Sequence, residues 1–190
     1  MKATFLSISL LLILFTSKKI KAQSFEAYLI AGFDVSQIDG DKLSGYNKGG
    51  GVFGGATAFK LNDEWKLQQE ITYYQRGSRA TDQQLSLDNF SIRRVDYIDF
   101  SLVGHHLFND KWSLFVGAGY GVFMNVKSDV KEDKSLYNGD LFLTAGPQYA
   151  LSEVLSAAIK LQYSVLPIFE NQDAYNNSIN LTLRYKMISK

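Results

Sequence analysis

Apolar and polar residues alternate with a period of two along several stretches of the chain. In SINLTLRYKM (residues 178–187), every second residue from Ile179 to Met187 is apolar, and the residues between them are polar. Because successive side chains of a strand point to opposite faces, this segment predicts a strand with one apolar and one polar face. The pattern fits a soluble protein that buries the apolar face. It also fits a membrane barrel that turns the apolar face to lipid.

The same pattern predicts eight strands joined by alternating short and long connections. Three short turns resemble one another: KLNDEWKL (60–67), LFNDKWSL (107–114) and ALSEVLSA (150–157). Longer polar stretches lie at residues 39–48, 79–91, 128–138 and 167–176. The predicted strands are residues 25–38, 49–61, 65–78, 92–107, 112–127, 138–151, 155–166 and 177–187.

Strand length and the sorting of the connections favour the membrane barrel. Each predicted strand reaches the roughly 9–11 residues that a tilted strand needs to cross a membrane. Outer-membrane barrels have an even number of strands, short periplasmic turns and long extracellular loops. We therefore predict an all-β fold, an eight-stranded antiparallel up-and-down transmembrane β-barrel. The alternative is a soluble lipocalin-like barrel with the two faces reversed.

The composition agrees with a protein made mostly of strands. The 190 residues include 13 Phe, 11 Tyr and 2 Trp, but only 2 Pro and no cysteine, and aromatic residues are enriched in strands. Rings gather where the two membrane interfaces should be. They are Phe59, Trp65, Phe108, Trp112, Tyr149 and Tyr185 near the short turns, and Tyr46, Tyr73, Tyr137, Tyr163, Phe169 and Tyr175 near the long loops.

The N-terminus resembles a secretory signal peptide. An apolar run from Phe5 to Phe15 follows Lys2 and is too short for a membrane-spanning helix. Ala22 offers a small residue for cleavage, so we expect a signal peptide at residues 1–22 and a barrel domain at residues 23–190. A buried or anchoring helix is the other interpretation of the run. Cleavage would remove four lysines of the 20 basic residues and leave 16 against 19 acidic residues, a net charge of −3.

Charged residues on the polar faces of the predicted strands should meet inside the barrel. Unpaired charge in a confined interior is costly, so opposite charges should pair there. We interpret this network as a structural plug, because eight strands leave hardly any room for a channel; a selective pore is the alternative. The predicted network contains Lys66, Glu70, Arg76, Asp99, Lys160 and Arg184, with Lys186 on the same face.

The remaining candidates for chemistry are weak, and we predict no catalytic residue, cofactor or metal site. His105 and His106 are adjacent, so they point to opposite faces and read as residues of the barrel rim. Asp99, Ser101 and His105 share a face, but neighbours on one face lie roughly 7 Å apart, too far for a catalytic triad. The acidic stretches 39–41, 131–134 and 170–173 could bind Ca²⁺ but read as solvated loops. No basic tract indicates nucleic-acid binding.

Several motifs resemble a known family. They are AGFDVSQIDGD (31–41), LQQEITYYQRGSR (67–79), VDYIDFSLVGHHLF (95–108), GAGYGVFM (117–124) and TAGPQYAL (144–151). On these motifs the chain resembles the small outer-membrane β-barrel proteins of Bacteroidetes-type bacteria, the PorT-like family. It departs from them at Ser101, where a proline is common. The resemblance covers nearly all of residues 23–190 and implies an outer-membrane location without an assigned activity.

These observations predict a non-enzymatic barrel of the cell outer membrane. Its partners would be outer-membrane lipid and a protein or surface ligand at the extracellular loops. The alternatives are a barrel enzyme acting on lipid, which would depend on Ser101, and a narrow solute channel. The sequence leaves the ligand and the oligomeric state open.

Overall fold

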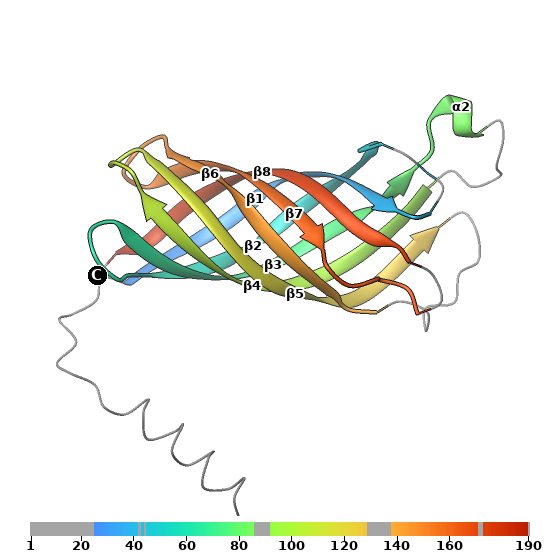
Figure 1. Ribbon diagram of the computed structural model, residues 1–190. Coiled ribbons are helices and arrows are strands. Elements are labelled where there is room, and N and C mark those ends of the chain that lie inside the picture. The colour runs from blue at the N-terminus through green and yellow to red at the C-terminus, as the bar shows by residue number, and fades with distance from the viewer. Residues whose placement is uncertain are drawn as a thin grey trace, which may run out of the picture.

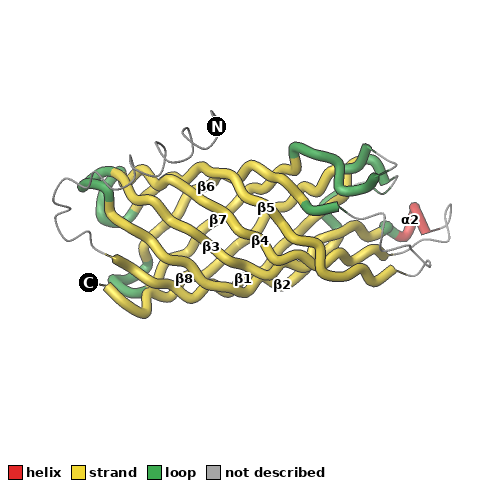
Figure 2. The backbone as a smooth tube through the Cα atoms, turned by 90° about the horizontal axis from the view of Figure 1, so that it is seen from below, coloured by secondary structure: helices red, strands yellow, loops and turns green. Residues whose placement is uncertain are grey.

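The computed structural model of the chain is a closed barrel in which each strand pairs with its neighbours in sequence (Figures 1 and 2). Residues 25–41, 43, 45–85, 92–128, 138–170 and 173–189 are described. The strands are β1 Phe25–Asp39, β2 Lys48–Lys60, β3 Trp65–Arg79, β4 Ile92–Leu107, β5 Trp112–Ser128, β6 Asp140–Ala150, β7 Leu155–Ser164 and β8 Tyr175–Ser189.

Antiparallel pairing of β1 with β8 closes the cylinder and confirms the predicted fold class. A single helical turn, α2 (Asp82–Leu85), lies between β3 and β4. Figure 1 shows α2 at one end of the barrel and the C-terminus at the other. Among the described residues, no helix is long and apolar enough to cross a membrane. The predicted signal peptide lies outside the described residues.

The polar side chains line the inside of the barrel and the apolar side chains cover its outside. On β8, Leu181 is 58% exposed and Leu183 is 49% exposed, whereas Arg184, one position further along, is 1% exposed. The same alternation runs along β3 and β7. A soluble barrel with the faces reversed would show the opposite burial, so this observation excludes that alternative.

The three short turns share one hydrogen-bonded geometry. In each turn, a polar side chain accepts hydrogen bonds from the backbone N–H groups two and three residues later. These bonds stabilise the turn in place of the hydrogen bonds between strands. Asn62 Oδ1 accepts from Glu64 and Trp65, Asn109 Oδ1 from Lys111 and Trp112, and Ser152 Oγ from Val154 and Leu155. The repeated sequence thus encodes a repeated turn.

The glycines of β5 make room for groups from the strands beside it. A Cβ atom on Gly119 would lie 2.5 Å from the ring of Phe142, and one on Gly121 would lie 2.6 Å from Oδ1 of Asp99. Phe142 and Asp99 are each 1% exposed, so neither has free space to move into. The glycines therefore allow this narrow lumen to hold a large ring and a buried carboxylate.

Rings form the predicted girdle clearly at the short-turn end and only in part at the other. Near the short turns, Trp65, Phe108 and Trp112 are exposed on the outer wall. His106 lies between two of these rings, with ring centroids 4.8 Å from both Trp65 and Phe108. At the long-loop end, Tyr46 and Tyr163 are exposed, and Tyr137 lies outside the described residues.

Phe169 was expected in the girdle of the long-loop end but packs toward the barrel mouth instead. It lies against an apolar cluster formed by Ile38, Val95, Tyr97, Val126, Ile168 and Ala174. Ile168 is fully buried, and its backbone N–H donates to the carbonyl of Ala174 at 2.9 Å. Ile168 and Ala174, in the connection between β7 and β8, therefore pack inward, where their side chains are shielded from water.

Replacing Asn109 with Ala should destabilise the barrel by about 1 kcal/mol, because two backbone N–H groups of the turn lose the side-chain oxygen that accepts their hydrogen bonds. The shift would be measured by reversible denaturant unfolding in lipid vesicles. Asp110→Ala, in the same turn, is the matched control and should leave stability nearly unchanged, since Asp110 is exposed. Equal effects of the two substitutions would contradict the role assigned to the Asn109 side chain.

Candidate functional site

A carboxylate shared by two cations lies in the middle of the lumen. Glu70 on β3 is fully buried and pairs with Lys160 on β7 and Arg184 on β8. The Arg184 Nη1 to Glu70 Oε1 distance is 3.0 Å. Gln68 donates to Oε1 at 2.7 Å and Ser101 donates to Oε2 at 3.5 Å. Charged groups from β3, β7 and β8 thus meet across the barrel axis.

A second cluster, nearer the long loops, inverts this arrangement by placing one cation between two carboxylates. Arg76 on β3 pairs with Asp99 on β4 and, at 2.9 Å, with Asp140 on β6. Its guanidinium also lies over the ring of Tyr74, 4.5 Å from the centroid. Asp140 accepts further hydrogen bonds from Ser164 at 2.6 Å and from Asn176.

A third cluster lies at the short-turn end and again has two cations for one carboxylate. Lys66 Nζ is 3.5 Å from Glu26 Oε2, and Lys186 Nζ is 3.6 Å from Glu26 Oε1. The hydroxyl of Tyr28 donates to the same carboxylate at 2.6 Å. Lys66, which we predicted in the polar network of the lumen, is buried and forms its ion pair with Glu26.

The structure therefore places the six predicted network residues in three groups rather than one. Glu70, Lys160 and Arg184 form the first group and Arg76 and Asp99 the second, while Lys66 belongs to the third. Sequence reasoning missed Glu26, Asp34 and Asp140, which are also inside. The alternation of apolar and polar residues along β1 and β6 could have revealed them, because apolar residues of these strands such as Leu29 and Leu141 face outward.

The charges of these lumen residues balance as a whole but not along the axis. The five cations Lys66, Arg76, Lys160, Arg184 and Lys186 face the five carboxylates Glu26, Asp34, Glu70, Asp99 and Asp140. Among these ten residues, the short-turn half has four cations for two carboxylates. The long-loop half has one cation for three carboxylates, and the buried Lys48 on β2 adds a second cation there. The excess of positive charge therefore lies toward the short turns.

The arrangement does not assemble the chemistry of a hydrolase. Ser101 is hydrogen bonded to Glu70, whereas His105 packs against the ring of Phe115 with centroids 5.2 Å apart. Within the described part of the chain, neither ring nitrogen of His105 has a hydrogen-bond partner. His105 was expected at the rim but is fully buried in the lumen, while His106 lies on the outer wall.

No metal centre is formed by the residues that the structure describes. Among them, no group of three or more His, Asp or Glu side chains is placed to hold an ion. The carboxylates of the acidic stretch 39–41 interact with other residues of the protein instead. Asp39 accepts hydrogen bonds from Gln37 and Asn177, and Asp41 forms an ion pair with Arg93 at 3.4 Å. Burial raises the pKa of Asp41 above its ordinary value. The acidic stretch 131–134 lies outside the described residues.

Comparison with known proteins agrees with the inside-out barrel. The family model of the outer membrane protein beta-barrel domain matches residues 7–186. The chain belongs to this family. It is a protein of the cell outer membrane, and its exposed apolar wall is the surface that faces lipid. A search of the curated proteins found no match.

Solved structures with a similar fold include two outer-membrane proteins. Neisserial surface protein A is 13% identical with a TM-score of 0.57, and the alignment covers 85% of this chain and 97% of that one. The attachment invasion locus protein Ail of Yersinia pestis, in a phospholipid bilayer nanodisc, is 18% identical with a TM-score of 0.52, covering 85% and 99%. At these identities the likeness concerns the fold alone.

Replacing Arg76 with Met should destabilise the outer membrane barrel by about 3–5 kcal/mol, because it leaves Asp99 and Asp140 buried without their shared cation. Denaturant unfolding in lipid vesicles would measure the loss. Arg79→Met, on an exposed position of the same strand, should change stability by less than about 0.5 kcal/mol.

Replacing Asp99 and Asp140 with Asn in the Arg76→Met background should recover part of the loss, because the buried charges then disappear together. If the Arg76→Met protein had the same free energy of unfolding as the wild type, the role assigned to the ion pairs would be contradicted.

Proposed function

We propose that this outer membrane barrel is non-enzymatic and closed, and that it acts as a structural membrane protein and through its long loops. The observation that carries the proposal is the filled lumen. Glu70, Arg76, Asp99, Lys160 and Arg184 are each at most 1% exposed and come from four different strands. Eight strands give an interior just wide enough for side chains, so these groups occupy the path that a solute would need.

The long loops are the part of the protein we propose for contact with a partner. Strands β1, β3, β5 and β7 all end on the side of the barrel opposite the short turns, so the connections that follow them would face the cell exterior. Loops held by a rigid scaffold carry binding functions more often than the scaffold does. Arg93, at the start of β4, pairs with Asp41 and lies 5.2 Å from the Phe169 ring, so it links the connection after β1 to the connection after β7.

We also propose that residues 1–22 are a signal peptide and that the protein is a PorT-like member of the Bacteroidetes-type barrels. The apolar run from Phe5 to Phe15 and the start of β1 at Phe25 support the first proposal. The motifs at residues 67–79 and 95–108 support the second. N-terminal sequencing of protein isolated from the outer membrane should begin at Gln23; a chain that still begins at Met1 would contradict the signal peptide.

The purified barrel should produce no discrete conductance steps in planar lipid bilayers, because buried ion pairs block the lumen. Insertion would be verified in the same preparation by resistance to protease, with a large porin as the positive control for recording. Reproducible single-channel steps from correctly folded protein would overturn the closed barrel and support the solute-channel alternative.

The enzyme alternative has a separate readout. Labelled phospholipid or lipopolysaccharide incubated with the folded barrel should be turned over no faster than in empty vesicles, because Ser101 binds Glu70 and not a histidine. Turnover that Ser101→Ala abolishes would contradict the non-enzymatic assignment.

A further inference from the structure

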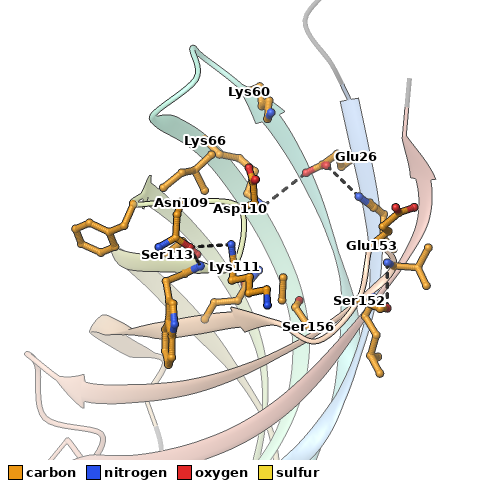
Figure 3. A pocket seen from close by; sticks show the side chains of 18 of the residues that line it. Glu26, Lys60, Lys66, Asn109, Asp110, Lys111, Ser113, Ser152, Glu153 and Ser156 are labelled. Carbon is orange, nitrogen blue, oxygen red and sulfur yellow. Dashed lines mark hydrogen bonds and ion pairs between the residues drawn. The ribbon is translucent and has the colours of Figure 1, made fainter.

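A cavity opens into the barrel at the short-turn end, away from the long loops. Its volume is about 620 Å³, which lies in the range of small-molecule binding sites. Figure 3 shows its wall, which includes Glu26, Lys66 and the turn that carries Asn109, Asp110 and Lys111. The proposed function uses the opposite end of the barrel, so this cavity has no role in it.

The inner part of the cavity has one positive charge in excess. Lys66 and Lys186 both line it and share the single carboxylate of Glu26, at 3.5 and 3.6 Å. These distances are longer than the 2.7–2.9 Å typical of a charge-assisted hydrogen bond. Each ammonium carries three donors, so both retain donors that a second carboxylate could occupy. Arg184, one inward-facing position deeper on β8, adds to the positive potential.

Uncharged polar side chains continue this inner surface. Gln148 lines the cavity and is 8% exposed, and its Oε1 atom has no hydrogen-bond partner among the residues described. Ser113 and Ser156 also line the cavity and are each 6% exposed. A buried amide oxygen accepts from an N–H donor, so Gln148 suits an amine or amide group of a ligand.

The outer part of the cavity carries the opposite charge. The three short turns contribute four acidic residues to its wall but only two lysines, Lys60 and Lys111. The acidic residues are Asp63, Glu64, Asp110 and Glu153. A ligand that is purely anionic would be repelled at this entrance, whereas a ligand that also carries an amine would be attracted. The cavity is thus polarised, with an acidic entrance and a basic interior.

We propose that this cavity binds a zwitterionic amino acid or short peptide, with its carboxylate between Lys66 and Lys186 and an amine toward the acidic entrance. The carboxylate would neutralise the excess charge left by the sharing of Glu26. The ligand class is an amino acid or short peptide with a free C-terminus and a free amine. Because the short turns face the periplasm, the ligand would come from that compartment.

The test uses the dipeptide Lys-Ala as probe, titrated into the isotopically labelled full barrel in lipid nanodiscs and followed by NMR. Saturable shifts are expected at Gln148 and Ser156, with none at the long-loop end. Lys-Ala amide, which lacks the carboxylate, should bind at least about tenfold more weakly, as expected when a charge-assisted hydrogen bond is lost. Lys66→Met and Lys186→Met should each weaken Lys-Ala binding by a similar factor.

Glu26→Gln should act in the opposite direction and tighten binding severalfold, since it frees both ammonium groups for the ligand. Lys127→Met, near the other end of β5, is the matched control and should bind as the wild type does. Because Lys66 is buried, Lys186→Met and Glu26→Gln keep the test valid if Lys66→Met fails to fold.

Three results would overturn the proposal. The first is the absence of saturable shifts with Lys-Ala. The second is equal binding of Lys-Ala and its amide, or of the wild type and Lys186→Met. The third is binding of inorganic phosphate at least as tight as that of Lys-Ala, which would show a simple anion site instead. None of these results depends on whether the barrel conducts ions or contacts a partner through its long loops.

Discussion

The ion pairs inside the lumen are the interaction on which the rest of the structure depends. An eight-stranded barrel is narrow, so every inward side chain meets side chains from strands across the axis. A charge that enters this space needs an opposite charge or hydrogen bonds there, because water cannot solvate it fully. Glu70, Arg76 and Glu26 each meet this requirement by bonding to two partners of opposite charge. These contacts tie nine charged groups from different strands into three ion-paired clusters.

The wall of the barrel is arranged around this polar interior. Residues such as Leu181 and Phe53, both 58% exposed, face outward because the residues that alternate with them along each strand point into the polar interior. The glycines of β5 belong to the same arrangement, since Phe142 and Asp99 occupy the space that larger residues would need. Lipid contact outside and charge pairing inside are therefore two consequences of one strand periodicity.

The two ends of the barrel differ in physical character. At the long-loop end, Ile168 and Ala174 pack with apolar residues of the strands in a buried cluster. At the short-turn end, the Asx and Ser turns are too short to fold inward, and a polarised cavity remains open. The excess of cations in that half is balanced by carboxylates deeper in the barrel, which leaves the basic interior of the cavity available to a ligand.

The sequence by itself determined the strand number, the short turns and the face of most strand residues, because each depends on local periodicity and local hydrogen bonds. Predicted strands such as residues 92–107 coincide with the observed bounds of β4. Only the tertiary structure decided which charges meet. Lys66 pairs with Glu26, and Asp140 joins Arg76, because strand stagger and barrel closure bring together residues that lie far apart in the chain. Periodicity assigns a face to each residue but carries no information about its neighbour across the axis.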